Sequence, residues 1–120
     1  MQAGPDLDAE VARKVLEVVV IMDTASGNYQ LRDVANKRFI AVHPYSTDTA
    51  TAHELLRDFK NKGCTFQINA PTEEESQWSV AISHPQIGGI NFGAKGESLP
   101  HAICQAILQF NSLFKLRKTS

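Results

Sequence analysis

The feature that most constrains the fold is a short polar junction, Pro44-Tyr45-Ser46-Thr47-Asp48. Proline has no N–H to donate to a sheet, so Pro44 is expected to end the apolar segment at residues 39–42. The serine, threonine and aspartate that follow offer side-chain oxygens to the unpaired N–H groups at the start of a helix. The junction therefore predicts a boundary between a strand and a helix. Helix starts also attract anions, phosphate included.

Three segments repeat apolar residues at the spacing of an α-helix. The first follows a loose start of the chain and has Asp6 or Asp8 as its expected cap. The second spans about residues 49–61 and ends at Gly63. The third begins near Pro100 and has the strongest amphipathic pattern. Their apolar positions are Leu7, Val11 and Val15; Ala52, Leu55, Leu56 and Phe59; and Leu99, Ile103, Ala106, Ile107, Phe110 and Phe114.

Six segments favour β-strands. The continuously apolar run from Val18 to Met22 predicts a strand buried on both faces. The first helix is expected to lead directly into this strand. Two further strands are expected at residues 29–34 and 38–42, joined by a tight turn at residues 35–37. Beyond the second helix, apolar residues alternate with polar ones, which predicts three strands with one buried face each. These alternating positions are Cys64, Phe66 and Ile68; Trp78, Val80 and Ile82; and Ile90, Phe92 and Ala94.

These elements predict an α+β fold in a single domain over residues 1–120. Because the connections are short, the sheet is expected to be mainly antiparallel, with about five to six strands packed with three helices. The expected order is α-β-β-β-α-β-β-β-α. Residues 1–5 are expected to form a loose N-terminus and residues 116–120 a basic C-terminal tail. A composition of 42% hydrophobic and 21% charged residues is typical of one globular domain.

Composition also excludes several classes of function. A formal net charge of -1 supplies no broad attraction for nucleic acid, so no duplex partner is expected. The longest apolar run is far shorter than the roughly twenty residues that cross a bilayer, so no membrane partner is expected. Cys64 and Cys104 have apolar neighbours and are interpreted as small core residues, and the four histidines have no metal-ligand spacing. We expect a cytoplasmic protein without a metal or another cofactor.

Three patterns resemble catalytic motifs, and each has a structural alternative. Residues 23–27 (Asp-Thr-Ala-Ser-Gly) resemble the active-site turn of retroviral-type aspartic proteases, although a plain hairpin turn accounts for them better. Residues 88–95 have two glycines five apart, but no helix follows directly as in a P-loop. His101 precedes Cys104 by three residues, which places both on one side of a helix. An apolar environment makes a thiol inert, so a core cysteine is favoured.

A fourth set of side chains has the chemistry of nucleotide recognition: aromatic rings for stacking, hydroxyls and amides for base edges, and cations for phosphates. Arg57 belongs to the face of the second helix that also carries His53 and Lys60. The C-terminal cations complement a helix end and could also meet a phosphate. The candidate ligand-binding residues are Tyr45, Ser46, Asp48, Arg57, Trp78, Asn91, Phe92, Lys95, Lys115 and Arg117.

Three segments, in this order, resemble the phage ABA-sandwich domain, a small family encoded in bacteriophages and prophages. They are residues 7–16, the Pro44–Asp48 junction with the apolar helix after it, and residues 99–108. The resemblance extends from about Leu7 to Phe110 and includes the intervening Trp78-Ser79-Val80. The chain departs from the family in a longer segment at residues 25–40 and in Val18–Val20, where aromatic residues are usual. The family as a whole has no assigned reaction.

In size, phage character and α+β composition the chain also resembles Thoeris anti-defence sponges. That resemblance implies a non-enzymatic protein that sequesters a cyclic ADP-ribose isomer or a cyclic oligonucleotide. It further implies a homo-oligomer, a dimer or higher, with pockets near subunit contacts. Arg57 and the C-terminal cations would then meet phosphates, Phe92 or Trp78 would stack on a base, and Asn91 would contact the base edge.

Two other functions stay open at the level of sequence. One is a protein-binding inhibitor of a host defence system, of the anti-CRISPR or antirestriction type. Such an inhibitor would use an exposed patch and needs no pocket. The other is a nucleotide hydrolase, for which Asp23, Asp48 and His84 are the candidate catalytic residues.

Overall fold

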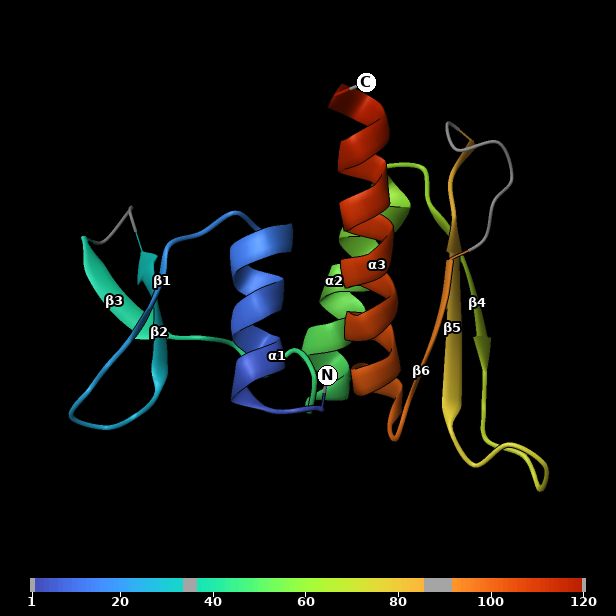
Figure 1. The fold of residues 1–120 in the computed structure, drawn as a ribbon, viewed down its shortest axis with the longest axis horizontal. Helices are drawn as coiled ribbons and strands as arrows, with labels where there is room; N and C mark the ends of the chain where they lie inside the picture. The colour runs from blue at the N-terminus through green and yellow to red at the C-terminus, as the bar shows by residue number, and fades with distance from the viewer. Residues whose placement is uncertain (1, 34–36, 86–91, 120) are drawn as a thin grey trace.

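The computed structural model describes residues 2–33, 37–85 and 92–119 and confirms the α+β class and the predicted order of elements (Figure 1). The first helical segment has two parts, an α-helix and a π-helix. The elements are α1 (Pro5–Glu10), η1 (Val11–Val15), β1 (Val20–Met22), β2 (Tyr29–Asp33), β3 (Arg38–Ala41), α2 (Thr49–Asn61), β4 (Thr65–Asn69), β5 (Trp78–Ser83), β6 (Phe92–Gly96) and α3 (Leu99–Thr119). The last helix thus includes residues 116–119 of the expected tail.

The six strands divide between two antiparallel sheets. We call them the N-terminal sheet, with order β1-β2-β3, and the C-terminal sheet, with order β4-β5-β6. Figure 1 shows the helices between them, with α1 next to the N-terminal sheet and α3 against the C-terminal sheet. The two sheets therefore lie on opposite sides of the helical layer.

The buried core lies between the helices and the inner face of the C-terminal sheet. Its fully buried side chains include Leu7, Val80, Ile82, Ile103 and Phe110. The approach of α3 to β6 is closest at Gly96, where an added Cβ would lie 2.5 Å from the backbone nitrogen of Ala102. Glycine at this position allows the helix to pack directly on the strand. Trp78 and Phe66 pack against the core from its edge.

The Pro44–Asp48 junction ends in the predicted helix cap. The Asp48 carboxylate accepts hydrogen bonds from the backbone N–H and the hydroxyl of Thr51, and these bonds lower the pKa of Asp48. The helix that follows buries Leu55, Leu56 and Phe59, as the apolar spacing predicts. It ends before Gly63, whose φ of 97° is a conformation that glycine adopts without strain.

The first helix differs from its prediction. It begins at Pro5 with Gly4 at the N-cap position, so neither Asp6 nor Asp8 is the cap. Proline is favoured at the first helical position because it has no N–H to leave unpaired. Asp8 is instead buried, with 6% of its surface exposed. The passage to β1 is also less direct than expected, because residues 16–19 separate η1 from the strand.

Asp8 is buried because it binds the Pro44–Asp48 junction. The Ser46 hydroxyl donates to Asp8 Oδ1 over 2.6 Å, and the Ser46 backbone N–H donates to the same oxygen over 2.7 Å. Gly4 N–H donates to Ser46 Oγ over 2.9 Å. Ser46 is fully buried. We call this set of hydrogen bonds the Ser46 clamp, and it holds the start of α1 against the start of α2.

The prediction that residues 18–22 form a strand buried on both faces is wrong. Val19, Ile21 and Met22 are 59%, 40% and 50% exposed, and Phe39 on β3 is 46% exposed. The reason is the position of the N-terminal sheet, which lies beyond α1 and has no helix over its outer side in the described part of the chain (Figure 1). Its best-buried strand residue is Leu31, with 9% exposed.

The alternation predicted for the later strands is confirmed in part. Val80, Ile82 and Ala94 are buried on β5 and β6. On β4 the burial falls along the strand, from buried Cys64 just before it, through half-buried Phe66, to Ile68 with 40% exposed. The strand β4 lies at the edge of its sheet, where fewer neighbours cover it. The expected turn residues Ala35 and Asn36, and strand residue Ile90, lie outside the described residues.

Both cysteines are core residues, as the sequence predicts. Cys104 is fully buried and Cys64 is 6% exposed. Burial raises the pKa of both thiols, and it raises that of Cys104 to about 12. His101, one helical turn before Cys104, accepts a hydrogen bond at Nδ1 from the Glu97 N–H. These surroundings favour the structural interpretation of the cysteine over a catalytic one.

The Ser46 clamp predicts a specific loss of stability. Ser46→Ala removes the hydroxyl and leaves buried Asp8 with one fewer donor, so the free energy of unfolding should fall by about 1–3 kcal/mol. Urea denaturation followed by circular dichroism measures the change. Thr47→Ala is the matched control, because Thr47 is the adjacent exposed residue and should change stability by less than about 0.5 kcal/mol. Equal effects of the two variants would contradict the role of the clamp.

The buried thiols predict slow alkylation of the native protein. At about pH 8 a thiol with a raised pKa has little thiolate, and the fold also excludes the reagent. Iodoacetamide labelling, followed by intact mass, should therefore modify Cys104 only after a denaturant is added. Rapid labelling of native Cys104, with circular dichroism unchanged, would show an accessible and activated thiol.

Candidate functional site

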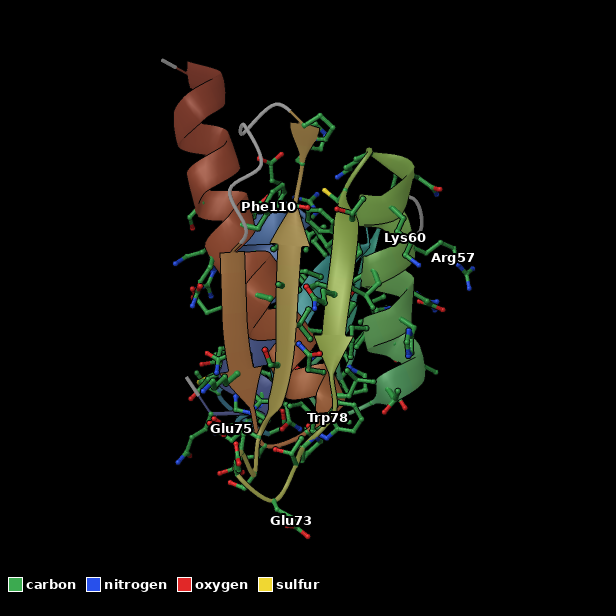
Figure 2. All side chains as sticks on the ribbon, turned by 90° about the vertical axis from the view of Figure 1, so that its right-hand side faces the viewer. Arg57, Lys60, Glu73, Glu75, Trp78 and Phe110 are labelled. Carbon is green, nitrogen blue, oxygen red and sulfur yellow. The ribbon has the colours of Figure 1, made fainter. Side chains whose placement is uncertain are left out.

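A groove between α2 and β4 is the best candidate site. Its volume is about 530 Å³, within the range of small-molecule sites. Arg57 and Lys60 lie on the outward side of α2, beside the C-terminal sheet (Figure 2). The groove combines basic and apolar side chains from the two elements, and its lining residues are His53, Leu56, Arg57, Lys60, Phe66 and Ile68.

The basic side of the groove follows from helix geometry. His53, Arg57 and Lys60 are at positions i, i+4 and i+7, so they share one stripe of α2. Among the described residues, the ion pairs of Arg13, Lys14 and Lys95 involve glutamates, and none involves Arg57 or Lys60. Cations of this kind are suited to binding phosphate.

The acidic residues of α2 influence a different part of the molecule. Glu54 and Asp58 lie on another stripe of the helix and act on buried Tyr45. The pKa of Tyr45 is raised by burial first and then by the negative charge of Glu54, with a smaller effect of Asp58. Glu54 and Asp58 thus lie on the stripe next to that of Arg57, and the residues that line the groove include the cations of α2 and not these two carboxylates.

The apolar side of the groove consists of Phe66 and Ile68 from β4, with Leu56 at its base. Leu56 is 5% exposed, Phe66 is half-buried and Ile68 is 40% exposed. Phe66 and Ile68 are two residues apart on a strand, so they face the same side. An aromatic ring beside the two cations Arg57 and Lys60 fits a ligand that has both a flat apolar group and phosphates.

The polar junction residues serve the fold. Tyr45 is 6% exposed, belongs to the core and contacts the His43 ring edge-on at 5.9 Å between centroids. Ser46 is fully buried in its clamp, and Asp48 caps α2. The ligand contacts predicted for these three residues stay predictions. In the structure the side-chain oxygens of Ser46 and Asp48 form hydrogen bonds within the protein, and the Tyr45 ring packs in the core.

Trp78 and Lys95 lie away from the groove. Trp78 is half-buried at the start of β5, at the opposite end of the C-terminal sheet from Arg57 and Lys60 in Figure 2. The Lys95 ammonium pairs with Glu75 at 2.6 Å, and its backbone carbonyl accepts a hydrogen bond from Gln105. The predicted set of binding residues is therefore dispersed, and Arg57 is its one member in the groove.

The remaining predicted residues are described in part. Phe92 begins β6 opposite Ile82, and Lys115 and Arg117 lie on α3. Asn91 lies outside the described residues, and so do the side chains of Phe92, Lys115 and Arg117. Their predicted contacts with a base or a phosphate stay predictions.

The hydrolase candidates are dispersed as well. Asp23 belongs to the β1–β2 hairpin turn, where its carboxylate accepts from Ala25 N–H and from the Ser26 hydroxyl. That arrangement confirms the plain hairpin turn. The ring nitrogen Nε2 of His84 contacts the Lys62 carbonyl oxygen at 3.0 Å, far along the chain from the Asp48 cap. Within the described residues, no group of three or more potential metal ligands comes together.

A second hollow, of about 880 Å³, lies between the η1–β1 connection and α3. Its cations are already paired, since Arg13 and Lys14 contact Glu10 at 2.9 and 2.8 Å. Its wall is formed by Val18, Val19 and Val20. This hollow therefore offers less attraction for an anion than the α2–β4 groove does.

Of the residues that line the groove, the sequence predicted Arg57 as a binding residue and placed His53 and Lys60 on the same helix face, but Phe66 and Ile68 were missed. Their alternation with polar residues was interpreted as a buried strand face. The signal that could have identified them is the proximity of β4 to α2, since Gly63 ends the helix and the strand begins at Thr65.

Among the helices of the described residues, none combines the length and the apolar character that a membrane span needs.

Comparison with known proteins identifies the family. The family model of the phage ABA sandwich domain matches residues 9–108. A crystal structure of a phage protein from Bacillus cereus ATCC 14579 has a similar fold, with a TM-score of 0.69, 17% sequence identity and 90% of each chain covered. No curated protein matches the sequence. The resemblance seen in the sequence is thus confirmed, and the chain belongs to the phage ABA sandwich domain family.

Proposed function

We propose that this phage protein sequesters a cyclic nucleotide immune signal, of the cyclic ADP-ribose type or a cyclic oligonucleotide, in the cytoplasm of the host. The observation that carries the proposal is the position of Arg57 and Lys60 beside Phe66 in one groove. A cyclic nucleotide has the two matching features, a flat base and negatively charged phosphates. Its removal would keep the signal from its host sensor.

The groove supplies recognition in two parts. The guanidinium of Arg57 can bind a phosphate through two parallel hydrogen bonds, while Lys60 adds a point charge. Phe66 offers a ring against which a base can stack, at a contribution of about 1–3 kcal/mol. Leu56 at the base excludes water from the stacked ring. His53 lies at the end of the same helical stripe and lines the groove.

The proposed function is binding without chemistry. The clearest nucleophile candidates near the core are unsuited to reaction, because Cys104 has a pKa of about 12 and Ser46 is fully buried. The groove itself is lined by cations, apolar side chains and one imidazole, that of His53. One such group without a paired acid, base or nucleophile supports sequestration over hydrolysis.

Release of an intact ligand tests this function. Purified protein is incubated with an extract that contains the products of an activated TIR enzyme or nucleotide cyclase, then separated, heated and filtered. Mass spectrometry should show that the signal disappears from the extract and returns unchanged after heating. A product of altered mass would show an enzyme. No depletion before heating would refute both binding and hydrolysis.

Charge removal in the groove tests the site. Arg57→Ala and Lys60→Ala should each weaken binding of cyclic ADP-ribose by about tenfold or more, because each removes a charge-assisted hydrogen bond. Isothermal titration calorimetry measures the dissociation constants. Lys14→Ala is the control, since it removes an equal charge at the second hollow. The opposite result, with Lys14→Ala weakening and Arg57→Ala unchanged, would move the site to that hollow.

A further inference from the structure

The outer face of the N-terminal sheet is a defined surface. Successive strand residues point to opposite faces, and the strand register aligns the outward residues in rows. One row has Val19, Arg32 and Phe39, since Arg32 N–H donates to the Val19 carbonyl and Arg32 pairs with Phe39. The next row has Ile21, Gln30 and Ala41. We call these six residues the outer face.

The two faces of this sheet have different surroundings. On the inner side, Leu31 is 9% exposed and the Tyr29 hydroxyl donates to Asp6 of α1 over 2.7 Å. On the outer face, Val19 is 59% and Phe39 46% exposed. The helix α1 therefore lies on the inner side of the sheet (Figure 1), where Met22 at the strand end is still 50% exposed, while Val19, Ile21 and Phe39 of the outer face are exposed to solvent.

The outer face carries large apolar side chains at its two edges. Val19 and Ile21 on β1 and Phe39 on β3 are exposed on either side of Gln30 and Arg32 on the central strand. An antiparallel sheet can leave one face to solvent, but large apolar side chains exposed close together mark sites of association. The main core cluster, as far as the described residues show it, takes its strand residues from β5 and β6. The N-terminal sheet therefore gains little from that core, and covering its outer face would stabilise it.

The charges at the two ends of the sheet indicate what covers it. Arg32 lies in the first outward row, and Asp23 follows β1 at the other end, where its N–H donates to Asn28. Asp23 is four positions after Val19, which is about 13 Å along the strand. A twofold axis that lies in the interface plane at right angles to the strands reverses them, and it brings the Arg32 end of one copy against the Asp23 end of the other. A net charge of -1 adds little repulsion between copies.

We propose that the outer face packs against the outer face of a second copy of this chain, in a twofold dimer. Ile21, Gln30 and Ala41 form the central row and meet their own counterparts. The Arg32 end of each copy lies over the Asp23 end of its partner, which gives two equivalent charge contacts. The faces pack as in other aligned sheet pairs, about 10 Å apart.

The dimer leaves both α2–β4 grooves open. The N-terminal sheet and β4 lie on opposite sides of the helical layer, so the interface is remote from the groove (Figure 1). This placement differs from the pockets near subunit contacts that the sequence resemblance implies. Dimer formation also needs no nucleotide, so it stands or falls separately from the proposed function.

Sedimentation equilibrium of the full-length protein without nucleotide tests the interface. The parent should be a dimer, and Ile21→Arg should raise the dimer dissociation constant by at least about tenfold, because it places a charge in the central row. Ile68→Arg is the matched control, since Ile68 is also 40% exposed and lies on an edge strand. It should leave the dimer intact.

A second variant keeps the test valid if Ile21→Arg fails to fold, as judged by circular dichroism. Arg32→Glu exchanges one exposed charged residue for another and should also weaken the dimer by about tenfold, less so in high salt. A parent that is monomeric at about 100 µM would overturn the proposal, as would a dimer that tolerates both variants or one that Ile68→Arg dissociates equally. A monomeric parent that binds a host protein through this face would assign it to a heterologous partner and also overturn the proposal.

Discussion

The arrangement of the helices depends on one buried hydrogen-bonded pair, Ser46 and Asp8. The serine hydroxyl and backbone N–H both donate to one carboxylate oxygen, and Gly4 N–H donates to the serine. These bonds join segments that are 38 and 42 residues apart in the chain. Because a buried carboxylate without donors is costly, the junction and the first helix must come together for either to be buried. The direction of α2, and hence the groove on its outer side, follows from this contact.

The sequence predicts those parts of the fold that local patterns determine. The spacing of Leu55, Leu56 and Phe59 predicted the buried side of α2. The oxygens of Ser46, Thr47 and Asp48 predicted where the helix starts, and the structure assigns the cap to Asp48. The sequence could not show the role of Asp8. A carboxylate before an apolar run can cap its own helix or bind a distant serine, and the local sequence is the same in both cases. The prediction that Val18–Met22 is buried was wrong for a related reason. Apolar composition predicts that a strand needs covering, but the covering element here is absent from the described chain.

Only the helical side of the candidate site could be predicted from the sequence. Arg57 and its neighbours on α2 were recognisable, since helical spacing places them on the polar side. Phe66 was not, because an alternating strand looks the same whether its apolar face meets the core or the rim of a groove. Trp78 and Lys95 had suitable chemistry, but the pairing of β5 with β6 places them elsewhere. The chemical type of each side chain is known from the sequence, whereas tertiary contacts determine which side chains come together in one site.

Because the clamp and the groove are separate, membership of the family indicates the fold and does not indicate the ligand. The Ser46 clamp is buried and specifies the arrangement of helices, whereas Arg57 and Lys60 are exposed on the other side of α2. Exchanging exposed cations changes stability little, while it changes which ligand the groove attracts. Family membership, which rests on the match over residues 9–108, is therefore evidence for the fold, and the ligand must be argued from the outer side of α2. A chain with the same clamp and an acidic stripe at these positions would keep the fold and reject a phosphate.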